Sequence, residues 1–233
     1  LLSAPGLDSK SACLLPEKID GKYVVFHRTW PDVVLDYFDD LDFKSDDKWL
    51  SSTPSIPMWR NDGKCSILYG KYPNIFTEHT DFEDDHLLQQ SATWKNLVSS
   101  SKRISARPGH WDSQKISMGA PPVKTKDGWL AVYSAVDRRE GHKYKMGAML
   151  LDKNDPSKVI ARSNSPILSP EEDYEHDGKP NVIYPSGAVI KNDELLVYYG
   201  GGDRHTCVAS APLSTFLKEL KEQTTPSLQT VIA

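Results

Sequence analysis

The chain has little cysteine, no strong charge of either sign and no long apolar run. Its 233 residues include three cysteines, Cys13, Cys65 and Cys207, which are too few and too scattered for a disulfide framework or a zinc site. The formal net charge is −4, so neither a nucleic acid nor an anionic membrane surface is an expected partner. No apolar run reaches the length of a transmembrane helix.

Residues 1–6 contain no initiator methionine and no basic segment followed by a long apolar core. We therefore expect the chain to be the interior of a longer protein, and a signal peptide upstream of Leu1 stays open. Isolated thiols are typical of a reducing compartment, so the expected localisation is cytoplasmic.

Short strands separated by turn residues dominate the sequence and predict an all-β fold. The turn pairs Asp20-Gly21, Asp127-Gly128 and Asn192-Asp193 each precede an apolar or aromatic strand. The expected strands are residues 22–28, 33–38, 66–69, 128–136, 144–151, 182–190, 195–199 and 206–210. Recurrence of one strand pattern favours a β-propeller over a β-sandwich.

Two segments depart from this strand pattern. Leu213, Phe216, Leu217 and Leu220 have helical spacing after Pro212, which predicts a short amphipathic helix at 212–222 packed on the β body. Residues 40–107 are expected to be an insertion or a divergent blade segment within one domain that spans residues 1–233. Histidines and carboxylates cluster at residues 78–86, but their spacing matches no standard metal site and predicts a solvated loop.

Three features could bind a polar ligand. Residues 184–203 predict a hairpin that ends in three glycines and Asp203, where a carboxylate on a side-chain-free loop could meet a ligand. Trp111 beside Asp112 is a combination that sugar sites use, although a turn with a core tryptophan is the simpler interpretation. Arg28 ends a predicted strand and offers a planar fork to a carboxylate or phosphate.

Longer motifs resemble a known family. The motifs are LPEKIDGKYVVFHR at 15–28, WDSQKI at 111–116, GAPPVKTKDGWL at 119–130, GAMLLDKNDPSKVI at 147–160 and YYGGGD at 198–203. In this order they resemble glycoside hydrolase family 130, the β-mannoside phosphorylases and β-mannosidases. The resemblance covers most of the chain except residues 40–107.

The resemblance implies a five-bladed β-propeller with a central pocket, and it implies that the N-terminal blades lie outside this chain. It implies inverting phosphorolysis of β-mannosides to mannose 1-phosphate, with inorganic phosphate as co-substrate. We expect no cofactor, and nothing visible in the sequence requires a metal. The phosphate-binding residues it implies are Lys10, Arg28, Lys124 and, with Tyr144 as the other candidate, His142. The substrate-binding residues it implies are Trp111, Asp112, Tyr184 and Asp203.

The resemblance also marks two departures. By the resemblance, the family's catalytic aspartate is expected upstream of Leu1, so no catalytic residue is assigned. Ser134, within Tyr133-Ser134-Ala135, stands where phosphorylases commonly have histidine. Two alternatives to a phosphorylase therefore stay open: a β-mannosidase, which hydrolyses with water, and a non-catalytic glycan-binding propeller. The expected partners are a β-mannoside oligosaccharide and phosphate, and a homo-oligomer is possible.

Overall fold

The computed structural model describes residues 11–29, 31–41, 102–141 and 143–231. It also gives the course of three short strands, β4 (Ser55–Trp59), β5 (Cys65–Tyr69) and β6 (Glu78–His79), which pair in the order β4-β5-β6. Most of the segment predicted as an insertion, residues 40–107, lies outside the described residues, so its division from the rest stays a prediction.

Three further sheets form the body, each with antiparallel neighbouring strands. The first sheet has the order β1-β2-β3-β7, with strands β1 (Ala12–Leu14), β2 (Tyr23–Thr29), β3 (Asp32–Phe38) and β7 (Arg103–Ile104). The second sheet has the order β12-β11-β10-β8, with β9 also paired to β10. Its strands are β8 (Lys115–Ser117), β9 (Val123–Lys124), β10 (Trp129–Val136), β11 (Tyr144–Leu151) and β12 (Val159–Arg162).

The third sheet has the order β13-β14-β15-β16. Its strands are β13 (Ile183–Lys191), β14 (Glu194–Gly201), β15 (His205–Pro212) and β16 (Gln229–Thr230). The predicted hairpin is therefore β13–β14. Asn192 and Asp193 form its turn with φ angles of 53° and 62°, the positive values that a tight hairpin turn requires.

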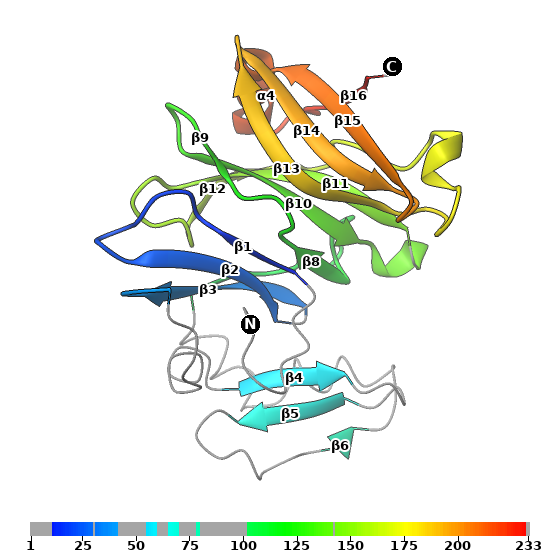
Figure 1. Cartoon of the computed structure of the whole chain (residues 1–233). Helices are drawn as coiled ribbons and strands as arrows, with labels where there is room; N and C mark the ends of the chain where they lie inside the picture. Colours follow the sequence, from blue (N-terminus) through cyan, green and yellow to red (C-terminus); the bar gives the residue numbers. More distant parts are fainter. Residues whose placement is uncertain are drawn as a thin grey trace.

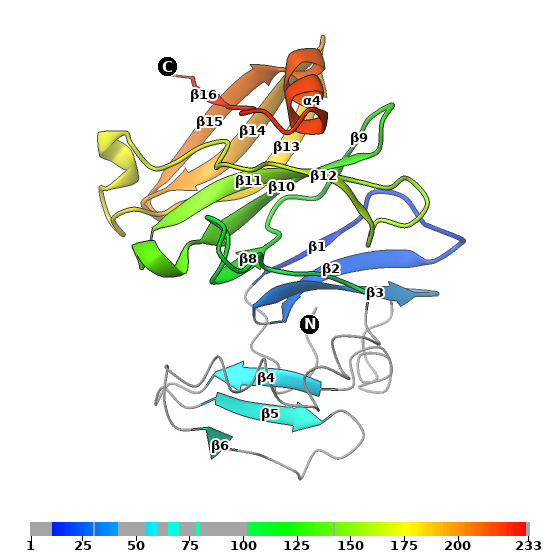
Figure 2. The same cartoon turned by 180° about the vertical axis from the view of Figure 1, so that it is seen from behind.

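The second sheet lies between the first and third sheets (Figures 1 and 2). Every residue of β10 is buried, because both faces of this central strand are covered. Tyr133 points into a core shared with Phe26 of the first sheet. Val132, on the opposite face, joins a core shared with Val197 of the third sheet. The alternation of side chains along β10 thus separates two hydrophobic clusters.

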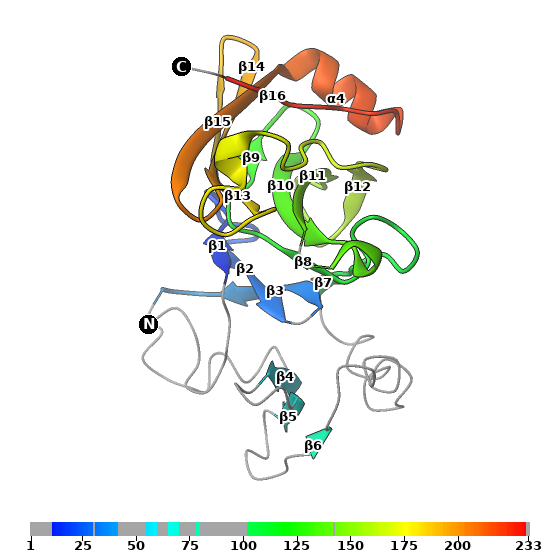
Figure 3. The same ribbon diagram turned by 90° about the vertical axis from the view of Figure 1, so that its right-hand side faces the viewer.

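The C-terminal helix, α4 (Leu213–Lys221), begins after Pro212 and confirms the helix that the leucine spacing predicted. Phe216, Leu217 and Leu220 are buried against the second and third sheets, and Figure 3 shows the helix lying across one end of them. Two 3₁₀ turns, Arg138–Glu140 and Asp173–Glu175, lie in connections between strands.

The fold is all-β with one short C-terminal helix, as predicted, and the part of the chain that the structure describes shows no closed propeller. The described residues form separate sheets that follow one another in chain order, and the number of blades stays a prediction. Among the described residues, no helix is long and apolar enough to cross a membrane.

Candidate functional site

A lysine and a tyrosine meet on the face of the second sheet that is turned toward the third sheet. Val136 of β10 pairs with Lys115 of β8 on one side and with Tyr144 of β11 on the other. Cross-strand partners project from the same face, so the two side chains flank Val136. The ammonium of Lys115 donates to the Tyr144 hydroxyl and lies 4.4 Å from the ring centroid.

A second lysine approaches the same tyrosine from the connection that precedes β13. The Lys179 Nζ lies 5.8 Å from the Tyr144 ring centroid and 3.7 Å from Asp203 Oδ2. Its backbone N–H donates to the Gly202 carbonyl at 2.7 Å. A Cβ atom on Gly202 would lie 2.3 Å from the Asp177 carbonyl oxygen, so glycine allows this close approach. This contact places Asp203, the residue after Gly202, next to Lys179.

Arg28 adds a third positive charge. Burial lowers the pKa of Lys115 below its ordinary value, the bonded Tyr144 hydroxyl opposes that shift, and the like charges of Arg28 and Lys179 lower it further. The first sheet is held to β8 at this point, because the Ile116 N–H donates to the Pro31 carbonyl at 2.9 Å. We call Arg28, Lys115 and Lys179 the cation cluster.

Two hydroxyl groups lie on the same side of the second sheet as Lys115. Ser117 is two residues along β8 and accepts a hydrogen bond from the Tyr184 hydroxyl at 3.2 Å. Gly119 makes room for that ring, since a Cβ atom there would lie 2.3 Å from Tyr184 Cε1. Three predicted residues therefore lie in one region. The charge of Arg28 acts on Lys115 of β8, Tyr184 donates to Ser117 of β8, and Asp203 pairs with Lys179.

Sequence reasoning named Tyr144 only as a second choice and missed Lys115 and Lys179. Lys115 lies within the motif WDSQKI, but the motif alone does not show which of its side chains shares a face with Tyr144. The strand register decides this, because Val136 pairs with both residues. Lys179 had no signal in the sequence, since it follows an irregular turn.

The structure places Lys124 apart from the cation cluster. Trp129, at the start of β10, pairs with Lys124, whereas Val136, at the end of the strand, pairs with Lys115. Seven residues of extended chain span about 23 Å, so Lys124 lies at the far end of the sheet from the cation cluster. Its ammonium is 2.5 Å from Glu17 Oε2 and lines a separate cavity of about 920 Å³. Among the described residues, Lys124 and Arg28 therefore do not meet in one pocket, and the predicted phosphate-binding role of Lys124 stays a prediction.

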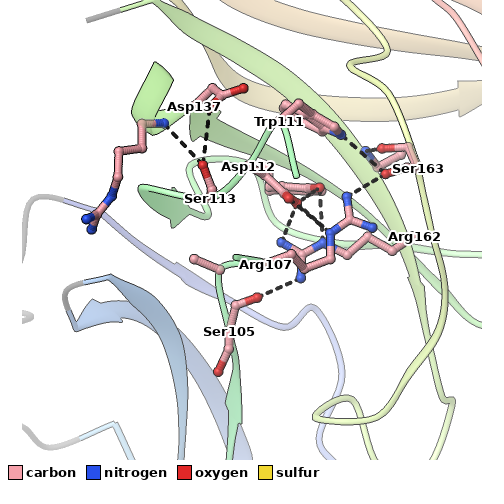
Figure 4. Close-up of polar contacts among 12 residues, drawn as sticks. Ser105, Arg107, Trp111, Asp112, Ser113, Asp137, Arg162 and Ser163 are labelled. Carbon is pink, nitrogen blue, oxygen red and sulfur yellow. Dashed lines mark hydrogen bonds and ion pairs between the residues drawn. The ribbon is translucent and has the colours of Figure 1, made fainter. Parts of the chain in front are cut away.

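Asp112 lies between Arg107 and Arg162 (Figure 4). The carboxylate is fully buried and lies 3.0 Å and 2.6 Å from nitrogens of Arg107 and Arg162, respectively. Tyr133 donates to it at 2.8 Å. Burial raises the pKa of Tyr133 to about 12, so the phenol keeps the proton that it donates. Asp112 is thus already bonded by protein groups.

Trp111 belongs to the same buried arrangement. Its ring stacks on Tyr133 with centroids 5.9 Å apart, and its indole N–H donates to the Ser163 carbonyl at 3.4 Å. Tyr133 points toward the first sheet, which is the opposite face of β10 from the face that carries Lys115. The simpler interpretation of Trp111, a packing residue, describes this position. Lys10 and His142 lie outside the described residues, so their predicted roles stay predictions.

The chain matches the β-1,4-mannooligosaccharide phosphorylase family over residues 52–222. It is 35% identical over 196 residues to a 1,2-β-oligomannan phosphorylase of Thermoanaerobacter, covering 84% of this chain and 48% of that protein. It is 37% identical to a β-1,2-mannobiose phosphorylase of the same strain, covering 86% of this chain and 49% of that protein.

A solved structure shows the same relation. The chain superposes on β-1,2-mannobiose phosphorylase from Listeria innocua with a TM-score of 0.61 and 27% identity, covering 94% of this chain and 48% of that one. The chain thus spans about half the length of the relatives it matches. With the family match extending over more than half of the chain, the protein belongs to glycoside hydrolase family 130, the family of the β-mannoside phosphorylases.

Proposed function

We propose that the protein takes part in inverting phosphorolysis of β-mannosides, with phosphate held by Arg28, Lys115 and Lys179. The observation that carries the proposal is the cation cluster itself. Lys115 is partly withdrawn from water beside two like charges, and the pKa of its ammonium is lowered as a result. A phosphate dianion would offset all three charges and replace repulsion with charge-assisted hydrogen bonds.

The positions of Asp203 and Tyr184 suit a sugar next to that phosphate. Asp203 Oδ2 lies 3.7 Å from Lys179 Nζ, and its side chain is about half exposed, so it can accept hydrogen bonds from sugar hydroxyls. Tyr184 offers a ring face and a hydroxyl held by Ser117. Together they would orient a mannosyl unit whose anomeric carbon faces the phosphate.

In the proposed reaction a phosphate oxygen attacks the anomeric carbon from the face opposite to the glycosidic oxygen. The carbon–oxygen bond to the leaving sugar breaks, the leaving oxygen takes a proton, and α-mannose 1-phosphate forms with inversion. Among the described residues we assign no proton donor. We also propose that the three larger sheets are successive blades of a β-propeller, because each is a separate antiparallel sheet that packs face to face on the next.

Phosphate dependence tests the proposal directly. The purified protein is incubated with β-1,2- and β-1,4-linked mannooligosaccharides, with and without inorganic phosphate, and mannose 1-phosphate is measured. We expect product only with phosphate. Equal turnover without phosphate would show a β-mannosidase, and mannoside binding without turnover would show a glycan-binding protein; either result overturns the proposal.

Three lysine variants test where the phosphate binds. Lys115→Met should raise the phosphate KM by at least about tenfold, the effect of losing one charge-assisted hydrogen bond. Lys158→Met is the matched control, because this side chain is 72% exposed and pairs only loosely, at 3.8 Å, with Asp155. Lys124→Met decides between the sequence-based and structure-based sites: a raised phosphate KM in this variant, with none in Lys115→Met, would move the site to Lys124.

A further inference from the structure

A buried hydroxyl next to the cation cluster has no acceptor or donor within the described residues. Ser134 is 1% exposed, and its Oγ makes no hydrogen bond in the part of the chain that the structure describes. Burying a hydroxyl without a partner costs free energy. Such a group in a folded protein calls for an explanation, and an unfilled ligand contact is one.

The strand register places Ser134 beside the lysine–tyrosine pair. Ser134 pairs with Ser117 of β8 and with Met146 of β11, whereas Val136, two residues on, pairs with Lys115 and Tyr144. Residues two apart on a strand project from the same face. The row Ser117–Ser134–Met146 therefore lies next to the row Lys115–Val136–Tyr144 on one face of the second sheet.

Packing alone gives no reason for serine here. Leu130 and Val132 precede Ser134 on the same face of β10, and both belong to the apolar core shared with the third sheet. An alanine or valine would continue that core without a polar atom to satisfy. The serine thus reduces stability at a point where the neighbouring charged groups are suited to an anion.

We propose that the Ser134 hydroxyl donates a hydrogen bond to an oxygen of the phosphate held by Lys115. The inference rests on the proposed phosphate site and adds a neutral donor to its three cations. Phosphate oxygens are strong acceptors, and a hydroxyl can bind one without adding further charge repulsion to the site. In this arrangement phosphate replaces Tyr144 as the partner of the Lys115 ammonium and supplies the acceptor that Ser134 lacks.

The proposal predicts opposite effects of Ser134→Ala on stability and on phosphate binding. Without phosphate, the variant should unfold at the same or a higher temperature than the parent protein, because an unpartnered buried hydroxyl is removed. The rise in unfolding temperature that phosphate produces should shrink. The KM for phosphate should increase by about tenfold, while the KM for the mannoside should stay within about twofold.

Ser163→Ala is the matched control. Ser163 is also fully buried, but its hydroxyl accepts a hydrogen bond from the Ala148 N–H at 3.2 Å. This variant should unfold at a lower temperature and keep the parent's KM for phosphate. The two variants remove the same atom from two buried serines, so the comparison separates ligand binding from packing.

The outcomes distinguish the two proposals. If phosphate stabilises and drives turnover of the parent, and Ser134→Ala has an unchanged KM for phosphate, the Ser134 inference is wrong and the phosphate site stands. A fall in the unfolding temperature of Ser134→Ala without phosphate also counts against it. If phosphate neither stabilises the parent nor affects its turnover, both proposals fail.

Discussion

The Arg162 Nη2 atom lies 2.6 Å from Asp112 Oδ2, and the carboxylate is completely buried. Arg107 holds the same carboxylate from another direction, at 3.0 Å. Arg162 also donates to the Ser105 carbonyl at 2.7 Å, and Arg107 to the Ser163 carbonyl at 2.7 Å. One buried negative charge therefore ties β12 to the segments at residues 105–112, between the first and second sheets.

Removing that charge should destabilise the protein strongly. Asp112→Asn leaves two arginines near a neutral amide in a buried site, and breaking a buried pair in this way costs about 3–5 kcal/mol. We expect a loss of about 3 kcal/mol in the free energy of unfolding, measured by urea denaturation. Asp177→Asn is the control, because its ion pairs with Arg204 and His205 are exposed. Equal stability of the two variants would contradict a structural role for Asp112.

A substitution at Gly147 should disturb the same region by steric overlap. A Cβ atom at Gly147 would lie 2.5 Å from Tyr133 Cζ and 2.7 Å from Trp111 Cη2. Both rings are buried and stacked, so Gly147→Ala should lower the free energy of unfolding by about 1–3 kcal/mol. Gly187→Ala is the control, since its Cβ would meet no atom within 4 Å. Matching unfolding curves for the two variants would show that the rings shift freely.

Asp137 should make the protein less stable in acid. The Arg139 side chain, bonded at 2.7 Å to the buried carboxylate, lowers the pKa of Asp137 to about 2. Because the folded pKa is depressed, the stabilisation is present above the unfolded pKa of about 4 and is lost as the pH falls toward 2. It amounts to at most about 2 kcal/mol, since Arg139 is largely exposed and salt screens it.

Asp137→Asn tests this pH dependence. The variant should show a smaller fall in the free energy of unfolding between pH 4 and pH 2 than the parent protein. Urea denaturation at half-unit pH steps measures the difference. Asp152→Asn provides the comparison, because its carboxylate accepts hydrogen bonds from the backbone N–H groups of Asn154 and Asp155 and, within the described residues, not from an arginine side chain. Parallel profiles for the parent and Asp137→Asn would contradict the prediction.

Lys179 should add to the effect of burial in lowering the pKa of Lys115. The positive charge of Lys179 contributes to the lowered pKa of Lys115, so Lys179→Met should raise that pKa. Since the protonated ammonium binds anions, phosphate affinity should persist to a higher pH in the variant, although it is weaker at neutral pH. Lysine-selective NMR titration measures the pKa, and Lys158→Met is the control. An unchanged Lys115 pKa would place Lys179 outside the cluster.

The sequence by itself determined the fold class. Turn residues at 20–21, 127–128 and 192–193 mark the chain reversals. The apolar runs that follow them are short, as is typical of strands. The helix at Leu213–Lys221 followed from four apolar side chains at helical spacing. The family also followed from the sequence, because the motifs at 119–130 and 147–160 are long enough to identify it.

Only the tertiary structure decided which motif residues share a site. Close neighbours in the sequence can lie on opposite faces of the second sheet, as Trp111 and Asp112 do relative to Lys115. Trp111 and Asp112 pack toward the first sheet, while Lys115 meets Tyr144 and is close enough to Lys179 and Arg28 for their charges to lower its pKa. Strand register and sheet packing set these positions, and both depend on contacts between residues that lie far apart in the chain.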